Sequence, residues 1–288
     1  MYKQTKQQEE TQSYFRQNAS KWKRNINMNF TIKQRNDYVL KVISGRKITE
    51  NYIDIGCGTG DLACAVAKIG IRSYGIDFAE DMIHIAKANA KKEGCEAKFV
   101  KCSLFNFDFS KYDIISANGV IEYLSPKELD RFLDVCYKGL NMGGSLILSS
   151  RNRLFNIFSL NKFTKEEVDN GNANCLLNEA IGIVNAEDVN ELLKYKTLPL
   201  SAKKKQVNTG IDVYIRYQYT PAQLAKELNK RGLKTAEIYP IHIHSVTPRF
   251  KEENPDIHEK ISKMIQDAGT NRYLIPYAST FMIHAIKQ

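Results

Sequence analysis

Residues 52–60 read Tyr-Ile-Asp-Ile-Gly-Cys-Gly-Thr-Gly. The apolar residues at the start of this stretch predict a buried strand, and residues 61–69 predict a helix directly after it. Glycines between a strand and a helix allow a tight turn and a close approach of the backbone to a ligand. The helix N-terminus beyond favours negative charge. The stretch therefore predicts a βα unit with a ligand-binding turn.

The spacing of the glycines argues against two common nucleotide sites. A dinucleotide fingerprint requires G-x-G-x-x-G, and after Gly56 and Gly58 the third glycine would fall at Asp61. An acidic side chain would then stand where a pyrophosphate lies. The sequence also lacks G-x-x-x-x-G-K-[ST], so we expect neither NAD nor a P-loop nucleotide.

Outward from this turn, short apolar runs alternate with amphipathic stretches. We expect strands at 52–55, 73–76, 97–101, 113–117, 145–149, 234–244 and 278–286, and helices at 61–69, 80–93, 126–140, 220–231 and 254–268. Alternation of this kind predicts βαβ units with right-handed crossovers, which is an α/β, doubly wound fold.

Four regions follow from the pattern. Residues 1–45 form an N-terminal helical lid segment, of which 1–13 are polar and expected to fray. Residues 46–150 form the core, residues 151–219 break the alternation and are interpreted as an inserted helical cap, and residues 220–288 complete the core sheet.

Composition limits the class of protein. The chain has 288 residues with 43% hydrophobic and 26% charged residues, an ordinary globular mixture. No apolar run is long enough for a transmembrane helix, and the polar N-terminus does not resemble a signal peptide. The six cysteines form no C-x-x-C pair, which favours a reducing, cytoplasmic setting. The net charge of +10 raises the question of a nucleic-acid partner.

The second predicted strand leads into Asp77. An acid at the tip of the second strand can accept hydrogen bonds from two ribose hydroxyls. The alternative is that Asp77 only caps the following helix. The complete array is far more specific than the glycines alone. It consists of a strand, D-x-G-x-G-x-G, a helix, a second strand and Asp.

These residues resemble the class I S-adenosylmethionine (SAM) dependent methyltransferases. YIDIGCGTG is similar to the family's first motif, SYGIDFAEDMIHIAKA to its second, KYDIISANGVIEYL to the fourth-strand motif and LNMGGSLILSS to the fifth. In type the sequence is nearest to the ubiquinone-biosynthesis O-methyltransferases. The resemblance implies a Rossmann-like sheet of seven strands, the last one antiparallel, and an enzyme that converts SAM to S-adenosylhomocysteine.

The resemblance also implies roles for individual residues. Asp54 would orient the methionine ammonium, the loop of Gly56, Cys57, Gly58 and Gly60 would approach the methionine moiety, and Asp77 would bind the ribose. The adenine would lie against Phe78, Met82 and the segment Cys102, Ser103 and Leu104, with Asn118 under the sulfonium. Met82 is equally typical of a helix core. The segment 101–104 lacks the carboxylate that many relatives have there.

The acceptor end has fewer signals. Arg151 follows the fifth strand and would clamp an acidic substrate, or it is a solvated loop residue. His242 and His244 alternate along a strand and so face one side. They are either a general base or a surface pair, and with no third ligand evident in the sequence we expect no metal. Tyr14 and Trp22 either cover the cofactor or pack on the sheet edge.

Methyl transfer from SAM depends mainly on positioning. We therefore expect a small-molecule methyltransferase, with an anionic acceptor and the cap 151–219 enclosing it. The alternatives are an RNA or protein methyltransferase and a non-catalytic SAM-binding subunit. Nucleic acid is disfavoured because basic runs are confined to 21–24 and 203–205. The sequence does not distinguish a monomer from a homodimer.

Overall fold

The computed structural model describes residues 5–25, 30–109, 111–204, 215–269 and 271–288, without the side chains of 19–25, 203 and 204. The strands are β1 (Asn51–Ile55), β2 (Arg72–Asp77), β3 (Lys98–Lys101), β4 (Tyr112–Ala117), β5 (Leu140–Arg151), β6 (Ser201–Lys204), β7 (Ile215–Gln218), β8 (Leu233–Ile243) and β9 (Ala278–Lys287). The α-helices are α1 (Lys6–Asn25), α2 (Phe30–Ser44), α3 (Asp61–Lys68), α4 (Glu80–Glu93), α5 (Pro126–Gly139), α6 (Phe155–Phe158), α7 (Lys162–Asp169), α8 (Ala173–Asn185), α9 (Pro221–Asn229), α10 (Pro248–Glu253) and α11 (Pro255–Asp267), with 3-10 turns η2 (Ile121–Tyr123), η3 (Val189–Lys194) and η5 (Arg272–Tyr277).

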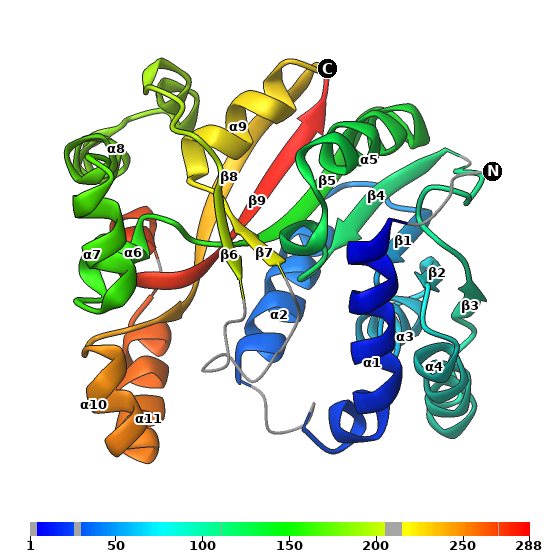
Figure 1. The fold of residues 1–288 in the computed structure, drawn as a ribbon. Helices are drawn as coiled ribbons and strands as arrows, with labels where there is room; N and C mark the ends of the chain where they lie inside the picture. Colours follow the sequence, from blue (N-terminus) through cyan, green and yellow to red (C-terminus); the bar gives the residue numbers. More distant parts are fainter. Residues whose placement is uncertain (1–4, 26–29, 110, 205–214, 270) are drawn as a thin grey trace.

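Seven strands form one sheet in the order β3-β2-β1-β4-β5-β9-β8 (Figure 1). Neighbours from β3 to β5 are parallel, whereas β9 is antiparallel to both β5 and β8. The last strand of the chain is therefore inserted between two others in the opposite direction. The predicted α/β fold, with a doubly wound seven-stranded sheet and an antiparallel last strand, is confirmed.

Helices cover both faces of the sheet because successive side chains of a strand point to opposite faces. Ile53 and Ile55 of β1 join a core with residues of α5, α8 and α9. Tyr52 of the same strand joins a second core with residues of α2, α3 and α4. The result is a three-layer arrangement whose buried centre is formed by the parallel strands.

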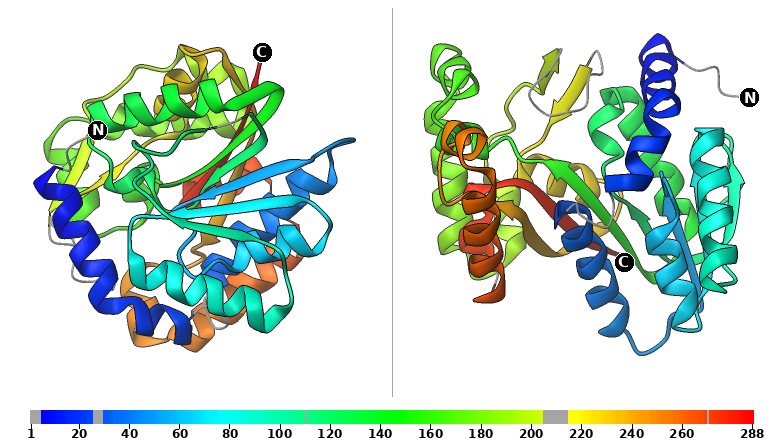
Figure 2. Two further views of the ribbon diagram at one scale, coloured as in Figure 1. Left: turned by 90° about the vertical axis from the view of Figure 1, so that its right-hand side faces the viewer. Right: turned by 90° about the horizontal axis from the view of Figure 1, so that it is seen from below.

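The N-terminal segment departs from the prediction. Residues 6–13, expected to fray, are helical in α1 because polar side chains anchor them to the core. Gln7 donates to the carbonyl of Tyr123 (2.9 Å), and Gln12 donates to the carbonyl of Phe78 (2.7 Å). The helix consequently lies across the carboxyl ends of the strands beside α4, as Figure 2 shows.

The segment 151–219 holds α6, α7, α8, η3 and the two-stranded β6–β7 sheet. Within this segment, the guanidinium of Arg153 makes two hydrogen bonds to Glu167 of α7 (3.0 and 2.8 Å). Both side chains are buried. Figure 1 shows α7, α8, α10 and α11 at the end of the sheet opposite α4. Within the described ranges, no helix is both long and apolar enough to cross a bilayer.

The glycine turn between β1 and α3 requires left-handed backbone. Gly60 has φ +82° and precedes α3. A Cβ added there would lie 2.7 Å from the Phe99 ring and 2.9 Å from the Ala86 Cβ. Gly70 has a similar φ of +86°, but a Cβ there meets nothing within 4 Å.

This difference predicts the cost of two alanine substitutions. Gly70→Ala should lower the free energy of unfolding by about 1–2 kcal/mol, the cost of a left-handed L-residue. Gly60→Ala should cost about 1–3 kcal/mol more, because the methyl group also overpacks the core. Urea unfolding measures both variants, and equal losses would contradict the close approach to Phe99.

Candidate functional site

A cavity of about 1290 Å³ lies at the carboxyl ends of the strands. Most of the residues predicted to bind the cofactor line it, together with Arg151, His242 and His244. From the predicted set, the lining residues are Asp54, Gly56, Cys57, Gly58, Asp77, Phe78, Met82, Cys102, Ser103, Leu104 and Asn118. One enclosed space thus connects the glycine turn with residues from the last third of the chain.

The glycine turn is held by its own backbone. The N–H groups of Gly56 and Cys57 both donate to the carbonyl of Ile76 (2.8 and 3.0 Å), and Gly60 donates to the carbonyl of Cys57 (2.9 Å). These donors are therefore already used within the protein. Gly58, with φ +52°, has open space where a Cβ would stand, so the turn offers a ligand a bare backbone surface.

Asp77 fixes this turn to the tip of β2. Its two carboxylate oxygens accept from the backbone N–H groups of Gly58 (3.0 Å) and Ala79 (2.8 Å). A carboxylate has about four acceptor sites, so capacity remains for a ligand. Burial raises the pKa of Asp77 to about 6 in spite of those hydrogen bonds.

Asp54 is a second buried acid at the end of β1. Ser116 donates to its carboxylate (2.7 Å), and the Ser116 oxygen lies 2.6 Å from the Tyr52 hydroxyl. Burial, opposed by the Ser116 hydrogen bond and assisted by the charges of Asp77 and Asp61, raises the pKa of Asp54 to about 7. This acid makes no ion pair with any described residue, so a cation bound here would favour its charged form.

The side chains on the rim differ partly from those predicted. Phe78 and Met82 line the cavity, and Met82 also packs with Ala79 and Phe15 as a core residue. Phe15, not Tyr14, is the aromatic residue of α1 that lines the cavity, with its ring 5.6 Å from Tyr123. The side chain of Trp22 lies outside the described residues.

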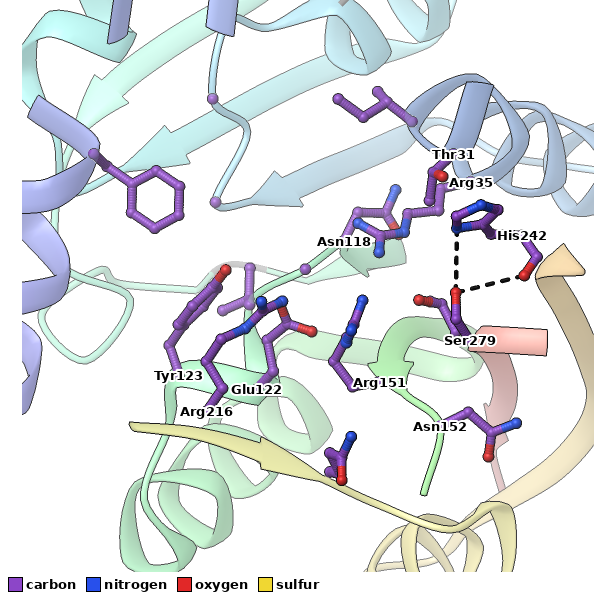
Figure 3. Close-up of a pocket in the computed structure, with 18 of the residues that line it drawn as sticks. Thr31, Arg35, Asn118, Glu122, Tyr123, Arg151, Asn152, Arg216, His242 and Ser279 are labelled. Atoms are coloured by element: carbon purple, nitrogen blue, oxygen red, sulfur yellow. Dashed lines mark hydrogen bonds and ion pairs between the residues drawn. The ribbon is translucent and has the colours of Figure 1, made fainter. Parts of the chain in front are cut away.

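Asn118 follows β4 in the middle of the cavity. Both polar atoms of its amide group are buried and have no hydrogen-bond partner within the described chain. Buried polar groups are rarely left unpartnered, so this amide is suited to a bound ligand. Figure 3 shows Asn118 between Arg35 and the turn that follows β4.

Three arginines surround the far side of the cavity, drawn in Figure 3. Arg216 of β7 forms a buried ion pair with Glu122. Arg35 of α2 and Arg151 of β5 have no ion pair or hydrogen-bonded partner for their guanidinium groups in the described ranges, and their Nε atoms are buried. Burial, together with the neighbouring Arg216, lowers the pKa of Arg151 to about 10. Three cations thus face one carboxylate.

The two residues after Arg151 have structural roles. Asn152 donates to the carbonyls of Ile275 (2.7 Å) and Ala278 (2.8 Å). Arg153 is used by its pair with Glu167. Of the three polar residues that follow the fifth strand, Arg151 is the one whose charged group remains available.

His242 of β8 and His244, just beyond the end of that strand, lie close together, with ring centroids 4.5 Å apart. The structure adds His258 of α11, which the sequence analysis did not identify because it lies in a different element. The Nε2 atoms of His242 and His258 are 3.3 Å apart. Burial, together with the charge of Lys251, lowers the pKa of His244 to about 2, so the imidazole is neutral and a weak base.

Arg35 was also not among the predicted site residues. Arg35 belongs to a helix that precedes the core, and Arg216 to the short β7 strand of the inserted segment. No periodicity or motif in the sequence connects these positions with β4 and β5. Only the folded arrangement brings them together.

The raised pKa of Asp54 predicts a pH-dependent penalty. The folded chain holds this proton up to about pH 7, whereas the unfolded chain releases it near pH 4. Stability therefore falls as pH rises through this window. From pH 5 to pH 8, the free energy of unfolding of Asp54→Asn should rise by about 2–3 kcal/mol relative to that of the wild type. Urea unfolding without ligand measures it. The exposed Asp108→Asn is the control. If the difference in unfolding free energy between Asp54→Asn and the wild type is the same at both pH values, the buried charge is contradicted.

Comparisons with known proteins agree with this geometry. Residues 53–144 match the family described as "Methyltransferase domain". A carboxy-S-adenosyl-L-methionine synthase of Campylobacter jejuni is 30% identical over 106 residues, which are 36% of this chain and 45% of the relative. The ubiquinone biosynthesis O-methyltransferase of Coxiella burnetii is 24% identical over 204 residues, 70% of each chain. The chain thus spans less than half the length of the synthase.

Solved structures share the fold at low identity. The magnesium protoporphyrin IX methyltransferase of Synechocystis superposes with a TM-score of 0.57 at 16% identity, over 98% of this chain and 100% of that one. The 1,6-didemethyltoxoflavin-N1-methyltransferase of Burkholderia thailandensis gives 0.59 at 12%, over 100% and 93%. Residues 53–144 thus match a methyltransferase domain, and the chain shares the fold of these solved methyltransferase structures.

Proposed function

We propose that the protein transfers a methyl group from SAM to a small anionic molecule. The observation that carries the proposal is the separation of charge within one cavity. Asp54 and Asp77 stand at the glycine turn, whereas Arg35, Arg151 and Arg216 stand beyond Asn118, with Glu122 paired to Arg216. A cationic ligand is favoured at the first end and an anionic ligand at the second.

The residues at the acidic end fit SAM. It supplies a methyl group on a positively charged sulfur, a good leaving group. Asp54 would hold the amino group of the amino-acid part and Asp77 the ribose hydroxyls, and the open surface at Gly58 admits a close ligand. The unpartnered amide of Asn118 lies between the two ends of the cavity. Relatives crystallised with SAM or S-adenosylhomocysteine support this assignment.

The residues at the basic end fit a carboxylate or phosphate on the acceptor. A guanidinium group can make two parallel hydrogen bonds to such a group, and Arg35 and Arg151 have the capacity for them. Holding the acceptor in line with the methyl group lowers the barrier mainly by positioning. His242 and His244 are weak bases, because burial and nearby positive charges lower their pKa values, and a base of low pKa removes a proton poorly.

The helices that line the cavity support a small acceptor over RNA or protein. Residues of α1, α2, α6, α7, α10 and α11 line it, so the acceptor side is covered by helices. Methyl-labelled SAM offered with carboxylic acids, phosphate monoesters and their neutral esters tests the class. Transfer to the acids and phosphates is expected. Transfer confined to neutral esters, RNA or protein would overturn the proposal.

Binding of SAM is testable without the acceptor. Asp77→Asn should weaken SAM binding by about 1.5–3 kcal/mol, because a charged hydrogen bond to the ribose is lost. Isothermal titration calorimetry measures the change, with the exposed Asp81→Asn on α4 as control. An unchanged affinity would refute the role of Asp77, and no binding to the wild type would refute the proposed function.

The acceptor end is tested at Arg151. Arg151→Met keeps the length of the side chain and removes its charge. It should raise KM for an anionic acceptor by about 10- to 100-fold, corresponding to about 1.5–3 kcal/mol for a charged hydrogen bond, and leave SAM affinity unchanged. Arg72→Met, exposed at the start of β2, is the control. Equal KM values in both variants would exclude Arg151 from the acceptor site.

A further inference from the structure

Three of the five histidines of the chain meet at one wall of the cavity. His242 is on β8, His244 follows the end of that strand, and His258 is on α11. One ring nitrogen from each lies within 4.8 Å of the others, and all three line the cavity. The sequence analysis expected no metal because it had found only two of the three.

The spacing fits a tetrahedral ion. Nitrogen atoms bound to Zn²⁺ at about 2.0–2.1 Å are roughly 3.3–3.4 Å apart in tetrahedral geometry. The Nε2 atoms of His242 and His258 are already 3.3 Å apart. The ring centroid of His244 is 4.5 Å from that of His242 and 4.7 Å from that of His258, so small side-chain rotations complete the set.

The Nε2 of His258 also lies 3.4 Å from the Ser262 hydroxyl, whereas other ring nitrogens of the cluster have no partner among the described residues. His244 is 8% exposed, yet neither ring nitrogen has a partner in the described chain, and the Nδ1 of His258 (2% exposed) also has none. The Nδ1 of His242 lies 3.2 Å from the Ser279 hydroxyl, the contact dashed in Figure 3. Histidines that bind metals are commonly oriented by such a contact at the second nitrogen.

We propose that His242, His244 and His258 form a three-histidine site for a divalent transition-metal ion of the Zn²⁺ class, with its remaining coordination position open to the cavity. Three neutral imidazoles and one open position are typical of catalytic rather than structural zinc sites. The backbone of His242 supports a specialised role, because its φ of +55° is rare for a residue with a side chain.

The surrounding charge determines what the open position would hold. No carboxylate belongs to the ligand set, and the ammonium group of Lys251 lies 3.4 Å from the Nε2 of His242. An ion bound there would keep its full positive charge, so an anionic fourth ligand is favoured. A role in holding an anionic acceptor rests on the proposed function, whereas metal binding itself does not.

Metal content tests the site directly. Untagged protein incubated with Zn²⁺ and freed of excess metal should retain one ion per chain by mass spectrometry of the metal. His258→Gln should weaken Zn²⁺ binding by more than the 10- to 100-fold typical of an outer-shell loss. The exposed His84→Gln on α4 should bind as the wild type does. Absence of stoichiometric metal in the wild type, or equal binding by His258→Gln, would overturn the site.

Two further variants separate a metal site from a structural histidine cluster. Lys251→Met should tighten Zn²⁺ binding, because it removes a competing positive charge. Ser279→Ala should weaken it by about 10- to 100-fold through lost orientation of His242. If neither variant changes the affinity, the cluster does not bind metal as proposed. SAM calorimetry on each variant shows that the acidic end is intact, so failure of this site is distinct from failure of the proposed function.

The open position has its own test. Co²⁺ in place of Zn²⁺ gives visible absorption bands that depend on its ligands. Azide, used as an anionic probe, should shift these bands in the wild type, because the fourth position faces the cavity. Unshifted bands at saturating azide would contradict an open position.

Discussion

Opposite charges are held apart inside a single cavity, and the proposed chemistry of the site depends on this separation. Burial raises the pKa of Asp54 and of Asp77 and lowers that of Arg151. A direct ion pair between the two ends would oppose both the raised pKa values of the acids and the lowered pKa of the arginine. The sheet prevents it, because Asp54 and Arg151 end different strands, β1 and β5, with β4 between them. The separation persists because backbone topology fixes it.

The fold could be predicted because its local signals agree with one another. The turn at 56–60 lies between a clear strand and a clear helix, and α9 begins with Thr220 as its N-cap and Pro221 in its first turn. Such signals are short-range. The start of α1 was missed because residues 6–13 are polar, and their helix depends on hydrogen bonds to Tyr123 and Phe78, more than sixty residues away. Hydrophobic periodicity does not predict such contacts.

The acidic end of the site was predictable for the same reason. Asp54, Gly58 and Asp77 lie within 24 residues, and their spacing defines a motif. The basic end has no such motif. Arg35, Arg151, Arg216 and His258 come from α2, β5, β7 and α11, and only tertiary structure brings them to one cavity. The sequence indicated Arg151 because it lies at the end of a strand of the recognised core, but it did not indicate Arg35 or His258.

Arg151 and Arg153 show why position in sequence does not assign a role. Both arginines lie near the carboxyl end of β5, yet Arg153 is buried and is neutralised by Glu167 of α7 within the inserted segment. Arg151 has no such partner. A buried charge without a partner costs stability, and a fold retains one where a ligand compensates it. The same reasoning applies to Asp54 and to the unpartnered amide of Asn118. Among the described residues, Asp54 lacks a counter-ion, and the Asn118 amide and the Arg151 guanidinium lack any partner. All three line one cavity, from the acid that would hold the cofactor to the cation that would hold the acceptor.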